Sequence, residues 1–296
     1  MNLLNHKLKN IIKNDVSNNF KLFSRVVLSA LVLFSVMSCN DDSESFDTEE
    51  QQLDYAEVLL ESQMDQASEA IDDIALDVYE VQEASEASKN ASNFNLPDCV
   101  TVTVVLEQGS REITIDFGTE GCEVNGNVLK GKVILSYERD PDLQQVFISK
   151  SLEDFYFNDK QVEGQKTILK ELSNENGNPQ FTRTGTITIT WPNGLQASRN
   201  GEKVREWIEG AFNGIWSDNV FEVTGFWSTT FVNGNSHNYE VVIPLRREVI
   251  CTYFVSGSID VERTNFSGVF DYGEGDCDNM ATFTFANGTT VDVLLN

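Results

Sequence analysis

The sequence predicts a mainly β protein in which a long N-terminal amphipathic helix is followed by a large antiparallel β-meander. Three observations predict it: a segment without Gly or Pro whose apolar residues recur at steps of three and four, a longer region in which threonine alternates with aliphatic or aromatic residues, and Asn-Gly dipeptides that punctuate this region. They leave open whether the strands form a twisted sheet, a sandwich or a barrel.

Residues 1–38 have the pattern of a lipoprotein signal peptide. Five basic residues lead into the apolar run 26–38, as in the n-region and h-region of a signal. The run of about 13 residues is shorter than the roughly 20 that a transmembrane helix needs. It ends Val-Met-Ser-Cys39, which resembles the bacterial lipobox, whose cysteine receives diacylglycerol before cleavage. We expect membrane attachment through a lipid on Cys39, and an ordinary secretory signal with a chance cysteine is the alternative.

An acidic tether follows at residues 39–47. Its beginning, Asn-Asp-Asp-Ser-Glu at residues 40–44, is similar to the short tract that sends lipoproteins of Bacteroidetes bacteria to the cell surface. A merely solvated linker would have the same composition. We expect a lipid-anchored protein of the bacterial outer membrane, exposed at the cell surface.

The helix is predicted over residues 48–84, because its apolar residues form one stripe at helical spacing. Asp47 or Thr48 can cap its first amides. The stripe needs a partner, either the β-domain or a second helix in a coiled-coil pair. Residues 85–98, rich in Ser, Ala and Asn, are predicted to be a linker.

From residue 99 to residue 296 the apolar period changes to two, which is typical of strands with one buried face. Seven Asn-Gly dipeptides suit tight hairpin turns because both residues tolerate positive φ. They lie at 125–126, 176–177, 193–194, 200–201, 213–214, 233–234 and 287–288. We expect about a dozen strands in one β-domain.

Cysteines 99, 122, 251 and 277 form an even set, and disulfides persist in the compartment that a secretion signal implies. Residues 116–122 and 271–277 share the pattern Asp, aromatic, Gly, three residues, Cys, and each follows another cysteine by one hairpin length. This internal duplication predicts the bridges Cys99–Cys122 and Cys251–Cys277. A closed barrel would make Cys99–Cys277 feasible instead, because it brings the first and last strands together.

The C-terminal segments also carry a family resemblance. The stretch that begins at Cys251, the segment Phe-Asp-Tyr-Gly-Glu-Gly-Asp-Cys277-Asp-Asn and the final Phe-Ala-Asn-Gly288 resemble a group of uncharacterised flavobacterial (Bacteroidetes) envelope lipoproteins with a C-terminal DYGxGxCDN segment. The resemblance covers the β-region. It implies an envelope location and an all-β fold, and it carries no known activity.

The net charge of −26 excludes nucleic acid as a partner and favours solubility or cation binding. Four acids in the duplicated C-terminal motif could hold Ca²⁺, which prefers oxygen ligands: Asp271, Glu274, Asp276 and Asp278. A solvated turn pinned by a disulfide is the alternative, because the spacing is not that of an EF-hand loop. We expect no other cofactor.

Two tryptophans, Trp207 and Trp216, are the candidates for exposure and for stacking on a sugar, with packing in the core or at a sheet edge as the alternative. Trp191 and Trp227 share strand faces with core residues. No catalytic residue is predicted, since His237 stands in a turn without a recognisable triad. We expect a non-catalytic binding or structural role with a glycan or an envelope protein as partner. The alternative is an envelope hydrolase that cleaves polysaccharide through a carboxylate pair.

Overall fold

The computed structural model describes residues 55–89, 93–138, 144–263 and 267–295. The predicted signal peptide, Cys39, the predicted acidic tether and the predicted start of the helix lie outside these residues. Contacts divide the chain into residues 1–46 and 47–296, and everything described belongs to the second unit. Its elements, in chain order, are α1 (Tyr55–Ser88), β1 (Thr101–Leu106), β2 (Ser110–Asp116), β3 (Cys122–Val124), β4 (Asn127–Glu138), β5 (Gln145–Phe157), β6 (Lys160–Glu171), β7 (Gln180–Thr190), β8 (Gln196–Glu209), the 3₁₀ turn η1 (Trp216–Asp218), β9 (Val220–Phe231), β10 (Ser236–Glu248), β11 (Ser256–Arg263), β12 (Ser267–Glu274), β13 (Met280–Phe285) and β14 (Thr290–Leu294).

The predicted helix is present as α1, and it continues four residues beyond the predicted end at residue 84. The Ser85 and Ser88 hydroxyls donate to the carbonyls of Val81 and Ala84 one turn earlier, so these serines stay inside the helix instead of capping it. The helix ends at Lys89, whose φ of 58° is left-handed. Within the described ranges, no helix is both long and apolar enough to cross a membrane.

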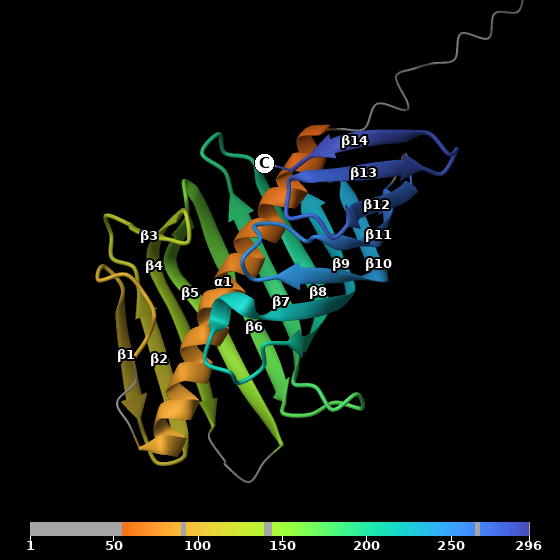
Figure 1. The fold of residues 1–296 in the computed structure, drawn as a ribbon. Coiled ribbons are helices and arrows are strands. Elements are labelled where there is room, and N and C mark those ends of the chain that lie inside the picture. The colour runs from red at the N-terminus through yellow and green to blue at the C-terminus, as the bar shows by residue number, and fades with distance from the viewer. Residues whose placement is uncertain (1–54, 90–92, 139–143, 264–266, 296) are drawn as a thin grey trace, which may run out of the picture. The chain divides into compact units, whose positions relative to one another are not determined.

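The strands form one antiparallel sheet, which confirms the predicted mainly β fold. Neighbours in the sheet are neighbours in the sequence from β1 to β14, except that β3 pairs only with β4 beside the main path. The described strands thus form a single meander with β1 and β14 at its two edges. Helix α1 lies across one face of this sheet, with strands from both halves of the meander around it (Figure 1).

Glycines inside the strands allow neighbouring strands to approach closely. Gly185 on β7 pairs with Gly201 on β8, and both have positive φ. A Cβ on Gly201 would lie 2.4 Å from the Phe226 carbonyl oxygen. The prediction that residues 200–201 form a turn is therefore wrong. The other six Asn-Gly pairs lie in connections between strands, but this one lies in the middle of β8, where the backbone of β9 comes close.

Two apolar clusters hold the sheet. The larger one joins α1 residues such as Met64 and Ile71 to the inner faces of strands up to β9. The second contains side chains of β9 to β14 and includes none from α1. Helix α1 therefore buries its apolar stripe mainly on the N-terminal half of the sheet, and it faces the second cluster with polar residues.

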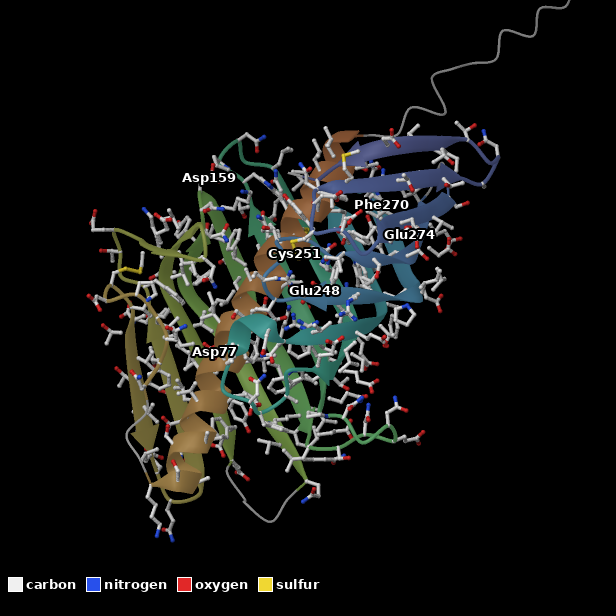
Figure 2. All side chains as sticks on the ribbon, viewed as in Figure 1. Asp77, Asp159, Glu248, Cys251, Phe270 and Glu274 are labelled. Atoms are coloured by element: carbon white, nitrogen blue, oxygen red, sulfur yellow. A yellow bond between two sulfur atoms is a disulfide. The ribbon has the colours of Figure 1, made fainter. Side chains whose placement is uncertain are left out.

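Both predicted disulfides are present. Cys99–Cys122 and Cys251–Cys277 have Cα–Cα distances of 5.7 and 5.5 Å (Figure 2 labels Cys251). The duplicated motif also repeats its local structure. In one copy the Gly118 amide donates to Asp116 at 2.8 Å, and in the other the Gly273 amide donates to Asp271 at 2.7 Å.

Candidate binding site

One side of α1 carries an acidic residue at almost every turn, and each of these acids meets a polar group of the sheet. We call this set of contacts the charge ladder. Its acids, from the N-terminal end of α1, are Glu57, Glu61, Asp65, Glu69, Asp72, Asp73, Glu80, Glu83 and Glu86. Their partners on the sheet are Arg263, His237, Arg199, Lys203, Arg183, Arg205, Lys150, Lys166, Arg247, Lys170, Tyr137 and Arg111. The helix is therefore fixed on the sheet by charge as well as by its apolar stripe.

The middle of the ladder is the most deeply buried part. Asp72 is fully buried and contacts Lys150, Lys166 and Arg183. Burial alone would raise the pKa of Asp72, but these three cations hold it well below its usual range. Burial lowers the pKa of Lys166 to about 7, in spite of Asp72. A buried cluster of this kind stabilises only as a complete set, because removal of one member leaves its partners as uncompensated charges.

At the N-terminal end, Glu57 accepts hydrogen bonds from Asn235 at 2.8 Å and Asn233 at 3.1 Å. Burial opposes ionisation of Glu57, yet these bonds and the guanidinium of Arg263 lower its pKa. Burial, with Arg263 beside it, lowers the pKa of His237. The neutral imidazole donates from Nε2 to Glu57 at 2.8 Å, and its Nδ1 lies 3.1 Å from the Tyr239 hydroxyl.

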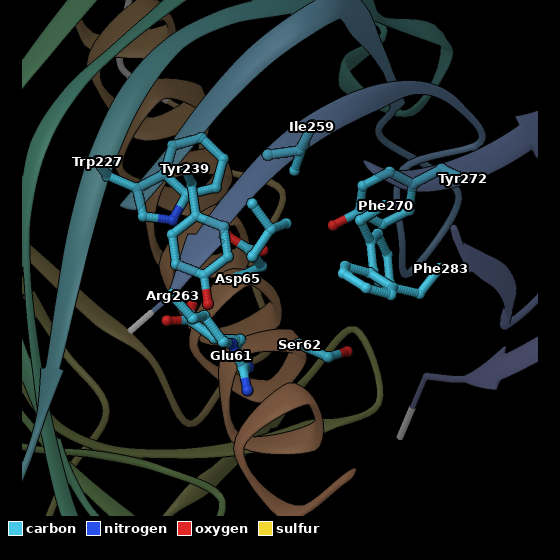
Figure 3. Close-up of a pocket in the computed structure, with 11 residues that line it drawn as sticks. Glu61, Ser62, Asp65, Trp227, Tyr239, Ile259, Arg263, Phe270, Tyr272 and Phe283 are labelled. Atoms are coloured by element: carbon cyan, nitrogen blue, oxygen red, sulfur yellow. The ribbon is translucent and has the colours of Figure 1, made fainter. Parts of the chain in front are cut away.

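Beside this end of the ladder lies a recess between α1 and strands β9 to β13. It is partly open to solvent, and eleven residues line it: Glu61, Ser62, Asp65, Trp227, Tyr239, Ile259, Val261, Arg263, Phe270, Tyr272 and Phe283. Figure 3 shows two walls, with Trp227, Tyr239 and Ile259 on one side and the rings of residues 270, 272 and 283 on the other. The polar residues of α1 form the floor.

The recess exists because the helix does not fill it. At the positions that face the second apolar cluster, α1 carries Glu61, Ser62 and Asp65. Glu61 and Asp65 turn toward Arg199 of β8, so neither side chain packs against the rings of β12 and β13. Space between an ion-paired helix and an aromatic wall is therefore left for a ligand.

Three buried polar atoms of the recess, Glu61 Oε1, Ser62 Oγ and Trp227 Nε1, have no hydrogen-bond partner among the described residues. Two of them belong to neutral groups, the Ser62 hydroxyl and the Trp227 indole N–H, whose residues are only 8% and 4% exposed. Two other indole N–H groups are satisfied, since Trp191 donates to Gln63 at 2.6 Å and Trp207 donates to Asn219 at 3.1 Å. Buried polar groups without partners are uncommon and costly, so the Ser62 hydroxyl and the Trp227 indole N–H point to a missing partner in the recess.

The charges of the recess are already matched. Arg199 and Lys203 lower the pKa of Asp65 although burial opposes this, and Asp65 is therefore ionised at neutral pH. Burial, together with Asp65, raises the pKa of Tyr272 well above its usual value, so its hydroxyl remains a neutral donor. A glycosidase acid needs a carboxyl group with a raised pKa, and Asp65 has the opposite shift. The arrangement suits binding by hydrogen bonds and ring contacts.

Of the two interpretations of Trp207 and Trp216, packing in the core is the one observed, and the exposed surface for a sugar is not found there. Trp207 is only 3% exposed, and its ring lies 5.5 Å from that of Phe221 in the larger core. Trp216 is half-buried and packs edge-on against Trp207 at 5.8 Å. Strand β8 turns the Trp207 side chain toward the core face of the sheet. Trp227, predicted to be a core residue, is buried but lines the recess.

Two of the four acids suggested for Ca²⁺ accept hydrogen bonds in local turns. Asp271 accepts the Gly273 amide, and Asp278 accepts the Met280 amide at 2.9 Å. Among the described residues, the structure gathers no group of three or more His, Cys, Asp or Glu side chains suited to hold a metal ion. Binding of Ca²⁺ by Asp271, Glu274, Asp276 and Asp278 stays a prediction.

The sequence contains a signal for the ladder that the apolar periodicity conceals. Glu57, Glu61, Asp65 and Glu69 recur at steps of four, which places them on one side of a helix. An unbroken acidic side on a helix that must also dock apolar residues indicates a basic partner surface. The recess itself has no such signal, because its walls come from five separate elements.

Comparison with known proteins gives no relative for this chain. No protein-family model, no curated protein and no solved structure matches it.

Proposed function

We propose that this protein is a non-catalytic binding protein, held in a bacterial envelope by a lipid on Cys39, and that the recess beside α1 is its binding site. The observation that carries the proposal is that two neutral polar groups, Ser62 Oγ and Trp227 Nε1, are buried without a partner among the described residues in a recess with aromatic walls. A bound ligand would satisfy them, whereas an empty recess leaves them costly.

Occupation of the recess can be tested by filling it. Ser62→Phe places a ring where the ligand would lie, and Ser85→Phe on the same helix, outside the recess, is the matched control. Thermal shift assays with neutral oligosaccharides, acidic oligosaccharides and dodecanoate should show that at least one class stabilises the protein and that Ser62→Phe abolishes the shift. If no class produces a shift, or if Ser62→Phe leaves it unchanged, the recess is not the binding site.

The membrane anchor is a separate part of the proposal, supported by the lipobox-like sequence that ends at Cys39. Cys39→Ser should prevent both lipid attachment and processing, so radioactive palmitate should no longer label the protein. Ser38→Ala keeps a small residue before the cysteine and should retain the label. A labelled Cys39→Ser protein would show that the lipid is attached elsewhere.

Exposure at the cell surface is supported by the acidic tract after Cys39. Protease added to intact cells should cleave the protein. Replacement of Asp41, Asp42 and Glu44 by Ser should protect it while leaving the lipid in place. Resistance of the unaltered protein would contradict the proposed location.

A further inference from the structure

The walls of the recess are suited to a flat ligand with apolar faces. Trp227 and Tyr239 are stacked at 5.3 Å with an angle of 12° between their planes, and together they form one wall. The Lys203 ammonium lies 4.2 Å from the centre of the Trp227 ring, so this indole is fixed by two neighbours and its N–H edge remains free. Phe270 and Tyr272, in edge contact at 5.0 Å, belong to the opposite wall.

The polar groups of the recess are suited to hydroxyl groups on the rim of that ligand. Trp227 Nε1 can only donate, whereas the Ser62 and Tyr272 hydroxyls can donate or accept. The Tyr272 hydroxyl points into the recess from the β12 wall (Figure 3). Ser62 stands on the helical floor, so the polar groups approach from different sides. A ligand with one polar end could not reach all of them.

The charges favour a neutral ligand. An anion would meet the carboxylates of Glu61 and Asp65, both already paired with Arg199. A cation would meet Arg263, which contributes the positive charge of the lining. Either ion would also lose hydration in a mainly aromatic recess, and no opposite charge there is left unpaired to compensate for this loss.

We propose that the recess binds a neutral sugar residue, with its C–H faces between the aromatic walls and its hydroxyl groups on Ser62, Trp227 and Tyr272. A pyranose ring combines two apolar faces with a rim of groups that both donate and accept hydrogen bonds. A fatty acyl chain would cover the rings but leave the polar groups unsatisfied, at a cost for each one. This inference rests on the proposed function, because it assigns a ligand class to the same recess.

The test removes single hydroxyl groups. Ser62→Ala and Tyr272→Phe each delete one hydroxyl group and keep the apolar surface, and Ser85→Ala is the control outside the recess. We expect neutral hexose oligosaccharides to bind the unaltered protein in isothermal titration calorimetry. Ser62→Ala and Tyr272→Phe should each weaken binding about fivefold, the effect of one ordinary hydrogen bond, and Ser85→Ala should not.

Unfolding curves keep the test independent of folding defects. Ser62→Ala removes an unpartnered buried hydroxyl group, so its unfolding midpoint should be equal to or higher than that of the unaltered protein. If neutral sugars bind all variants equally, or do not bind, the inference is overturned. Dodecanoate binding that Ser62→Phe abolishes, without any sugar binding, would also overturn it, while the recess would remain a binding site.

Discussion

Asp72 shows how single residues determine where α1 lies. Its carboxylate is fully buried and is shared by Lys150, Lys166 and Arg183, which come from three different strands. Desolvation of four charges is expensive, and only their mutual contact offsets it. The buried carboxylate of Asp72 therefore favours the docked position of α1 in which all three cations reach it.

Removal of this carboxylate should destabilise the protein strongly. Asp72→Asn leaves Lys150, Lys166 and Arg183 facing a neutral amide, with only Arg183 keeping a second acidic partner among the described residues, Glu69, and we expect the free energy of unfolding to fall by about 3–5 kcal/mol. Urea denaturation measures this. Glu153→Gln is the control, because it breaks the exposed Lys132–Glu153 pair at 2.6 Å and should cost less than about 1 kcal/mol. Equal effects would show that the ladder contributes no more than surface charge.

Ionisation of Asp77, unlike that of Asp72, should destabilise the folded protein. Burial, with Asp73 and Glu80 on the same helix, raises the pKa of this carboxyl group from 3.8 to about 6 (Figure 2 labels Asp77). The folded state then binds the proton more tightly than the unfolded state, so stability falls as the pH rises from about 4 to about 6.

Asp77→Asn removes this penalty. At pH 7 the variant should be more stable by about 1–2 kcal/mol, a range that allows for partial solvent screening at the site, and near pH 3.5 the gain should vanish. Thermal unfolding at both pH values measures the difference. A gain of the same size at both would mean that ionisation of Asp77 is not its cause.

At the scale of elements, the alternation of apolar residues predicted the strands and the duplicated motif predicted the disulfides, because both depend on local sequence. The place of Gly201 in the middle of β8 could not be predicted in this way, because within the sequence this residue is indistinguishable from the Gly of a hairpin turn. Its pairing with Gly185 and the close approach of the β9 backbone explain why a glycine stands there.

Gly201→Ala should be among the most destabilising glycine substitutions. The new Cβ would lie 2.4 Å from the Phe226 carbonyl oxygen and 2.5 Å from the Trp227 Cα, so the β8–β9 backbone must move. Gly288→Ala is the control: its φ is also positive, at 86°, but no atom lies within 4 Å of the new methyl group.

We expect the control to lose about 1–2 kcal/mol from backbone strain alone. Gly201→Ala should lose more and should also change the Trp227 fluorescence, because this indole lies against the substituted position. Equal losses in the two variants would mean that the β8–β9 approach has little energetic effect.

At the scale of the whole molecule, the larger core accounts for the apolar stripe of α1, and the charge ladder accounts for its acidic side. Of the two partners that the stripe could have, the β-domain is the one observed. The recess could not be predicted from the sequence. It forms because α1, held by ion pairs with β8, stands away from the rings of β12 and β13. Sequence periodicity shows which face of an element is apolar, but it does not show where two packed elements leave a space between them.

Hydrogen–deuterium exchange with a bound neutral oligosaccharide tests the central claim most directly. If the recess is the binding site, the ligand should slow exchange in the N-terminal half of α1 around residues 61–65 and in β9 to β13, and Ser62→Phe should remove this protection. The half of the sheet from β1 to β6 should exchange as before. Protection confined to β1 to β6, or unchanged by Ser62→Phe, would contradict the claim that the recess binds the ligand.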